Sequence, residues 1–110
     1  MVRPKSDSDS GRSRAYLFMK QPGVYILQSA KNSRYYVGST EDVKERLKTH
    51  NSGWVKATVN MKPLELKVFI PCSNITEAKQ AEYRLKKYKR RDILEKVTKD
   101  GLFPWQYMPA

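Results

Sequence analysis

Short runs of apolar and β-branched residues alternate with polar segments along the chain, and these runs predict three strands. Residues 23–28 are Gly-Val-Tyr-Ile-Leu-Gln and residues 34–38 are Arg-Tyr-Tyr-Val-Gly, both compositions typical of strands. The polar cluster at 30–33 lies between them, so the two strands are expected to form an antiparallel hairpin. A third run at 64–70, Leu-Glu-Leu-Lys-Val-Phe-Ile, alternates near its start and stops at Pro71, which predicts a third strand.

The first predicted helix follows the hairpin and covers residues 42–50. Ser39 begins a capping-box pattern, and Thr40 is a second candidate for the N-terminal cap. The sequence at 51–53, Asn-Ser-Gly, is a typical helix stop. The stretch at 54–62 has no clear period and is predicted to be an irregular basic loop.

Two further helices are predicted in the C-terminal half. The cap signature at 74–77, Asn-Ile-Thr-Glu, opens the longest helix, which is expected from Glu77 to about Lys89. Asp92 is the candidate cap of a short last helix that ends before Gly101. The order β-β-α-β-α-α predicts an α/β fold, a small three-stranded antiparallel sheet flanked by helices.

The remaining segments are predicted to be tails on a single domain. At 110 residues the chain is near the commonest domain size. Residues 1–20 are mostly small polar and charged side chains that cannot bury apolar area, so a disordered basic and polar tail is expected there. The folded domain is expected over 21–100, followed by an aromatic C-terminal tail over 101–110 that the pattern does not place.

The charge balance favours a polyanionic partner. The chain has 22 Lys and Arg against 11 Asp and Glu, a formal net charge of +11 and a pI near 9.9. A positive charge of this size creates a positive electrostatic potential around the protein, which attracts nucleic acid or anionic lipid. No apolar run is long enough to cross a bilayer and none follows the basic N-terminus as in a signal peptide, so no membrane partner and a cytoplasmic location are expected. The single Cys72 and single His50 exclude an internal disulfide and a multi-cysteine zinc site.

Two polar side chains lie on the predicted inner face of the first helix. At ~100° per residue, Val43 and Leu47 mark its buried stripe. His50 falls between them and Arg46 lies just beside it, so an imidazole and a permanent cation would point into the domain. The alternative is a histidine that stacks on the core and an arginine that extends past it to solvent.

A carboxylate occupies a similar place on the longest helix. Ala78, Ala81 and Leu85 form its inward stripe, and Glu82 projects from that stripe. A carboxylate on an apolar face needs a partner. The partner could be Lys86 one turn on, a surface ion pair worth under ~1 kcal/mol. It could equally be a cation such as Mg²⁺, which one or two carboxylates hold together with waters and phosphate oxygens.

Two tyrosines complete a candidate site. Tyr25 lies in the middle of the first strand and Tyr36 in the second, and each alone is explained by sheet packing with an exposed hydroxyl. The hairpin, however, brings the two phenols onto neighbouring strands. Together with the imidazole, the guanidinium and the carboxylate they suit phosphodiester hydrolysis, which needs a base for water, cationic charge at the transition state and a metal at the leaving oxygen.

The order and spacing of these residues resemble the GIY-YIG nucleases. Gly23-Val24-Tyr25 and Tyr36-Val37-Gly38 are similar to the two-part signature that names the family, with Val in place of the usual isoleucine in both triplets. Residues 42–51 match the family's first-helix pattern, and 81–86, Ala-Glu-Tyr-Arg-Leu-Lys, resembles its metal-binding helix, most similar to that of the small stand-alone bacterial members. The resemblance covers about residues 22–95.

This resemblance implies a role for each candidate residue. Tyr25 would activate or orient the attacking water, with His50 lowering its proton affinity, and Tyr36 would hold the phosphate or share the base role. Arg46 would stabilise the transition-state charge, and Glu82 would bind a single Mg²⁺ or Mn²⁺. A free tyrosine has a pKa of ~10, so Tyr25 would need positive charge nearby to act as a base.

The implied activity is metal-dependent endonucleolytic cleavage of DNA, single-stranded or structured. Larger members often carry an asparagine after the glutamate helix, and this chain has none between Glu82 and Ala110. No zinc finger or helix-turn-helix is expected within the chain, so specificity would come from basic side chains, the tails or a protein partner. The side chains expected to bind nucleic acid are Lys56, Lys62, Lys86, Lys87, Lys89, Arg90 and Arg91.

Two other functions fit the same residues. The domain could bind nucleic acid without cutting it. It could also be a nuclease subunit that a protein partner activates, docked through Trp105 and Tyr107.

Overall fold

A computed structural model describes residues 20–107, so nearly all of the predicted N-terminal tail lies outside the described residues. Three strands form one antiparallel sheet in the order β2-β1-β3. Strand β1 spans Gly23–Ser29, β2 spans Tyr35–Thr40 and β3 spans Leu64–Pro71. The predicted hairpin and the three-stranded antiparallel sheet are both confirmed.

The helices follow the predicted order. They are α2 (Val43–Asn51), the 3₁₀ helix η1 (Lys56–Met61), α3 (Ile75–Lys86), α4 (Arg91–Asp100) and the short α5 (Pro104–Tyr107). The order β-β-α-β-α-α is therefore confirmed. The prediction of an irregular loop at 54–62 is wrong in part, because most of that segment is the 3₁₀ helix.

The cap of α2 differs from the prediction. Asp42, rather than Ser39 or Thr40, is the N-cap, and its carboxylate accepts a hydrogen bond from the Glu45 N–H. The Thr40 hydroxyl instead bonds to the backbone of Asp42 and shapes the turn before the helix.

The ends of α3 and α4 are also shifted. Helix α3 begins directly after its Asn74 cap and ends before Lys89, whose φ of 51° is left-handed and cannot continue a helix. Arg90 occupies the N-cap position of α4, and Asp92 lies in the first turn, where its carboxylate pairs with the Arg90 guanidinium. The predicted end of this helix at Gly101 is confirmed, because that glycine is the left-handed C-cap.

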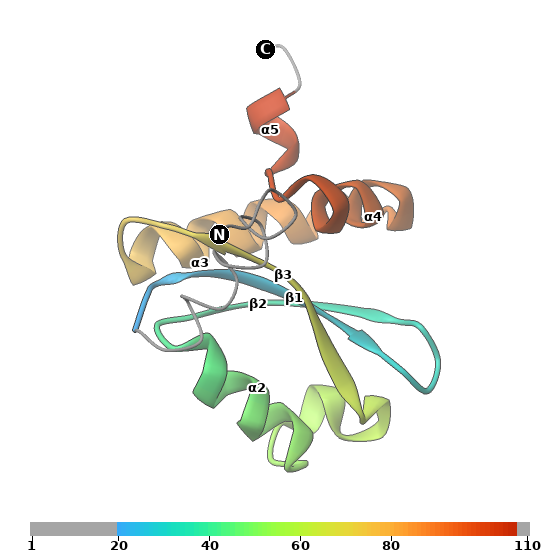
Figure 1. Ribbon diagram of the computed structural model, residues 1–110. Helices are drawn as coiled ribbons and strands as arrows, with labels where there is room; N and C mark the ends of the chain where they lie inside the picture. The colour runs from blue at the N-terminus through green and yellow to red at the C-terminus, as the bar shows by residue number, and fades with distance from the viewer. Residues whose placement is uncertain (1–19, 108–110) are drawn as a thin grey trace, which may run out of the picture.

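The sheet is covered on both faces, with α2 on one side and α3 and α4 on the other (Figure 1). Side chains alternate along the central strand β1, so Tyr25 and Leu27 face α2 while Val24 and Ile26 face α3 and α4. Both sets are buried. This explains why β1 is a continuous apolar run, and it places Tyr25 in the layer under α2.

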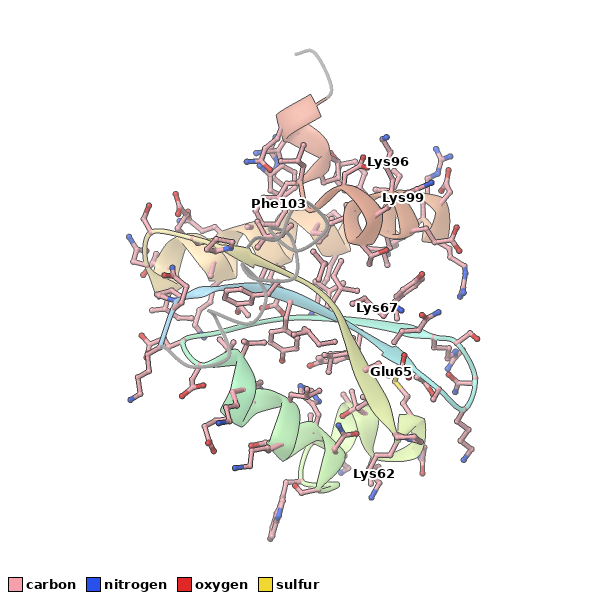
Figure 2. The ribbon with its side chains drawn as sticks, viewed as in Figure 1. Lys62, Glu65, Lys67, Lys96, Lys99 and Phe103 are labelled. Atoms are coloured by element: carbon pink, nitrogen blue, oxygen red, sulfur yellow. The ribbon has the colours of Figure 1, made fainter. Side chains whose placement is uncertain are left out.

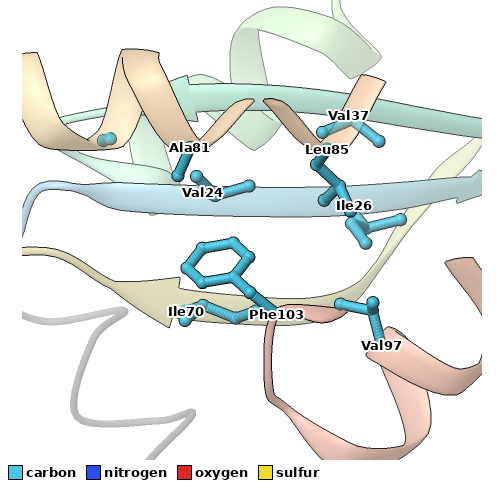
Figure 3. Close-up of a cluster of buried hydrophobic side chains, with 9 residues drawn as sticks. Val24, Ile26, Val37, Ile70, Ala81, Leu85, Val97 and Phe103 are labelled. Carbon is cyan, nitrogen blue, oxygen red and sulfur yellow. The ribbon is translucent and has the colours of Figure 1, made fainter. Parts of the chain in front are cut away.

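The segment after α4 packs back onto the sheet. Phe103 is 5% exposed and lies with Ile70 and Val97 in the core between the sheet and α4 (Figures 2 and 3). Its ring stacks on Trp105 with 4.7 Å between centroids, and the Arg84 guanidinium lies 4.2 Å from the Trp105 ring centre. Trp105, expected above to meet a protein partner, thus contacts its own domain.

Between residues 20 and 107 no helix has the length and apolar character needed to cross a membrane.

Candidate active site

The strand register brings the two tyrosines together. Tyr25 pairs with Gly38 and Leu27 pairs with Tyr36, so both phenols lie on the α2 face with their ring centroids 6.4 Å apart. A Cβ atom on Gly38 would collide with Oη and Cζ of Tyr25. The triplet at 36–38 ends in glycine because the Tyr25 phenol lies across the backbone of Gly38.

Helix α2 supplies the polar partners of Tyr25. His50 is 0% exposed, and its Nε2 lies 2.8 Å from the Tyr25 hydroxyl. The imidazole also meets the Tyr36 ring edge-on, with 5.0 Å between centroids. Arg46, one turn earlier, donates from Nε to the Tyr25 hydroxyl at 3.3 Å. The inward direction expected from the helical spacing is thus found for both side chains.

The far nitrogen of His50 meets a residue that the sequence analysis did not identify. Nδ1 lies 2.8 Å from the hydroxyl of Thr58, which is fully buried on η1. Thr58 donates in turn to the carbonyl of Val55 at 3.4 Å. No hydrophobic period marks Thr58 in the sequence, because its position depends on the path of a short 3₁₀ helix.

Burial keeps both members of the Tyr25–His50 pair neutral. It raises the pKa of Tyr25 to about 12, although the Arg46 guanidinium acts in the opposite direction. Burial also lowers the pKa of His50 to about 4, and the nearby Arg46 charge adds to that shift. The positive charge that Tyr25 is expected to need is present as Arg46, which lowers the pKa of Tyr25, but burial outweighs it, and His50 does not contribute to lowering that pKa. His50 carries no charge at neutral pH.

The lowered pKa of His50 predicts that the domain loses stability on acidification. The unfolded chain binds a proton at this residue near pH ~6.5, whereas the folded protein binds it only near pH 4, so falling pH favours the unfolded state. Between pH 7 and pH 5 the free energy of unfolding should fall by ~2 kcal/mol. Urea unfolding at the two pH values measures this loss. His50 is the only histidine, so His50→Gln should lose most of this pH dependence, and it should also be less stable at every pH because the buried contacts of the imidazole are lost. An equal drop in the free energy of unfolding of the variant would contradict the assignment to His50.

Glu82 of α3 bonds to Ser39 of the edge strand β2. Strand β2 is an edge strand, and α3 lies against it on the face opposite the tyrosines. The Ser39 hydroxyl donates to Oε1 of Glu82 at 2.5 Å, and the Lys86 ammonium lies 2.6 Å from Oε2. The Lys86 ammonium also lies 5.7 Å from the centre of the Tyr36 ring, and the charge of Glu82 contributes to raising the pKa of Tyr25. The ion pair considered from the sequence is present, and the same carboxylate is bound by Ser39, the residue that follows Gly38 on β2.

The donor set around Glu82 fits a hydrated divalent cation better than a closed protein cage. Within residues 20–107 no group of three or more His, Cys, Asp or Glu side chains could hold a metal. A single carboxylate beside the Ser39 hydroxyl suits Mg²⁺, which keeps several waters and takes other ligands from phosphate. The Lys86 side chain is 48% exposed and would have to leave Oε2 for a cation to bind there.

A basic groove of about 480 Å³ adjoins Tyr36. Its lining residues are Arg34, Tyr35, Tyr36 and Val37 from β2 and the hairpin turn, Met61 from η1, and Leu85, Lys86, Lys89, Arg90, Arg91 and Leu94 around the end of α3 and the start of α4. Four of the seven predicted nucleic-acid-binding residues are therefore gathered along one groove, together with Arg34, which the sequence analysis did not select. None of the lining residues is acidic.

The other three predicted binding residues lie outside this groove. Lys56 is exposed on η1, and the Lys62 ammonium lies close to Gly53 at the η1 end of the domain, away from Lys96 and Lys99 of α4 (Figure 2). The Lys87 ammonium lies 4.6 Å from the centre of the Tyr83 ring.

The three-stranded sheet and the helix order are those of a GIY-YIG catalytic domain, and a family model of that description matches residues 21–96. The chain therefore belongs to the GIY-YIG family of nucleases.

A UPF0213 protein of Bacillus licheniformis is 36% identical over 90 residues, which cover 78% of this chain and 89% of that protein. The UPF0213 protein YazA of Bacillus subtilis is 41% identical over 68 residues, 61% of this chain and 68% of YazA.

The UPF0213 protein YhbQ of Escherichia coli O127:H6 is 33% identical over 81 residues, 73% of this chain and 80% of YhbQ. No solved structure was found to match the chain significantly.

Proposed function

We propose that this domain is a metal-dependent endonuclease that hydrolyses phosphodiester bonds in DNA. The observation that carries the proposal is the Tyr25 hydroxyl, held between the Arg46 guanidinium and the His50 imidazole, with the Tyr36 ring beside it. Sheet packing does not require a buried phenol to contact both a cation and a neutral base, and such clusters of titratable groups are typical of active sites.

Tyr25 and His50 act together as the base. Because the pKa of Tyr25 is raised to about 12, a free phenolate is scarce at neutral pH. The phenol oxygen instead takes a proton from the attacking water while its own proton passes to Nε2 of His50, 2.8 Å away. The negative phosphodiester favours the imidazolium that forms, which offsets the effect of burial on the pKa of His50.

Arg46 and Tyr36 hold the phosphate. Arg46 uses Nε for Tyr25 and lines an open cleft of about 720 Å³, so its two Nη groups can donate to phosphate oxygens. Tyr36 is half-buried beside the basic groove, with its ring centroid 6.4 Å from that of Tyr25, and can donate its hydroxyl to a phosphate that lies in the groove. A divalent cation on Glu82 would supply positive charge at the leaving oxygen.

The basic groove guides the nucleic-acid backbone to Tyr36. Replacing Lys89, Arg90 and Arg91 together by Gln should therefore weaken DNA binding and make it less sensitive to salt. Each lost phosphate contact reduces the slope of log K against log salt by ~0.9 for duplex DNA. Fluorescence anisotropy at several salt concentrations measures the slope.

Removal of the same charge elsewhere is the control for this prediction. Lys67, Lys96 and Lys99 do not line the groove, and their joint replacement by Gln should change the slope less. Equal slopes for the two triple variants would exclude the groove as the main binding surface.

A non-catalytic nucleic-acid-binding module is the second candidate function. It is favoured by the Lys86 ammonium, which neutralises the carboxylate proposed to bind metal. The two functions are separated by incubating the protein with supercoiled plasmid, labelled single-stranded DNA, branched DNA and RNA in the presence of Mn²⁺ or Mg²⁺. Cleavage of DNA supports the nuclease, binding without cleavage supports the second candidate, and cleavage only after addition of cell extract supports activation by a partner.

A further inference from the structure

Thr58 is the buried residue of η1, and its hydroxyl reaches the nitrogen of His50 that does not face Tyr25. The side chain is 0% exposed and lies 2.8 Å from Nδ1. A buried threonine hydroxyl needs a hydrogen-bond partner, and Thr58 has two, the imidazole and the Val55 carbonyl. Its contact with His50 belongs to the same chain of polar groups that includes Tyr25 and Arg46.

One arrangement of protons gives every hydrogen in this chain of contacts an acceptor. The Arg46 Nε–H can only donate, so the Tyr25 oxygen accepts this hydrogen bond. The Tyr25 hydroxyl proton then points at its other neighbour, Nε2 of His50. The Thr58 proton goes to the Val55 carbonyl, so the Thr58 oxygen accepts from Nδ1–H of His50. In the opposite tautomer two donors would meet at the Tyr25 oxygen, and the tyrosine proton would have no acceptor among these groups.

We propose that Thr58 is a positioning residue that holds His50 in the tautomer protonated at Nδ1, so that the Nε2 lone pair accepts the Tyr25 proton. The catalytic consequence rests on the proposed nuclease function. As the water oxygen forms its bond to phosphorus, the water proton goes to Tyr25 and the Tyr25 proton goes to Nε2. The bond from phosphorus to the leaving oxygen breaks, and that oxygen takes a proton from solvent. His50 later returns its proton to the Tyr25 oxygen as Tyr25 releases one to solvent. Throughout, the proton on Nδ1 of His50 stays there and keeps its hydrogen bond to the Thr58 oxygen.

The tautomer can be measured directly, because the protein has one histidine and the ¹⁵N resonances of its ring belong to His50. At pH 7 the folded wild type should show a protonated Nδ1 and an unprotonated Nε2. Thr58→Val has a similar shape but no hydroxyl, and its folded form should shift towards the Nε2-protonated tautomer. Thr58→Ser restores an oxygen at the same place and should restore the wild-type tautomer. This readout does not depend on activity, and the wild-type spectrum tests the assignment even if Thr58→Val does not fold.

The rate of cleavage gives the second readout. Thr58→Val should lower kcat by ~10²-fold, the lower end of the usual contribution of a general acid–base group, with little change in KM. Thr58→Ser should stay close to the wild type. Thr98→Val removes a threonine hydroxyl from α4, where it bonds only to its own helix, and should leave the rate unchanged.

The proposal is overturned if wild-type His50 is protonated at Nε2, if folded Thr58→Val keeps the Nδ1–H tautomer, or if that variant cuts at the wild-type rate. A wild-type protein that cuts no nucleic acid would instead remove the proposed nuclease function. The ring nitrogen resonances would then still decide whether Thr58 fixes the tautomer of His50.

Discussion

Tyr25→Phe is expected to lower the rate of DNA cleavage by ~10²–10⁴-fold, the usual contribution of a general acid–base group. The substitution keeps the ring that fills the space above Gly38 and removes the one oxygen that contacts both Arg46 and His50. Because that hydroxyl is buried and bonded, its loss should also cost ~1–3 kcal/mol of stability, as Nε2 of His50 loses its donor. Single-turnover rates must therefore be measured at a temperature at which both proteins are folded.

Tyr88→Phe is the matched control for this substitution. Tyr88 packs partly against the core on the opposite face of the sheet, so loss of its hydroxyl should leave the cleavage rate unchanged. A folded Tyr25→Phe protein that cleaves within about threefold of the wild type would end the proposed role of Tyr25 in activating water.

Glu82→Gln is expected to abolish metal-dependent cleavage and to leave DNA binding intact or slightly tighter. The amide keeps the shape of the side chain but removes the charge that a hard cation needs. It also removes the repulsion between the carboxylate and a phosphate, which accounts for the direction of the binding change. The ion pair with Lys86 is half-exposed and contributes under ~1 kcal/mol, so the variant should remain folded.

Asp100→Asn breaks a similar i,i+4 ion pair, with Lys96 on α4, and should not affect cleavage. Cleavage by Glu82→Gln at the wild-type rate would show that Glu82 is structural, with Ser39 and Lys86 as its partners.

Much of the site was predictable from the sequence because its parts belong to regular elements. The two apolar runs define a hairpin, and its register, with Tyr25 opposite Gly38 and Leu27 opposite Tyr36, puts both phenols on one face of the sheet. The period of an α-helix likewise places Arg46 and His50 on the face of α2 that meets the sheet. These inferences need only local geometry.

The parts that could not be predicted depend on contacts between elements distant in sequence. Thr58 meets His50 because η1 turns back against α2, and Glu82 meets Ser39 because α3 packs against β2 from the other helical layer. Phe103 enters the core only because the chain reverses after α4. The direction of the Tyr25 pKa shift is a balance between burial and the Arg46 charge, and the sequence shows the charge but not the depth of burial.

The most direct test of the account is single-turnover cleavage of labelled DNA by the wild type and by Glu82→Gln in Mn²⁺, in Mg²⁺ and in EDTA. If Glu82 binds the catalytic metal, the wild type cuts with a divalent metal and not in EDTA, and the variant binds the same DNA without cutting it. Wild-type protein that binds DNA but cuts none of the substrates would contradict the account, as would cleavage that survives both EDTA and the Glu82→Gln substitution.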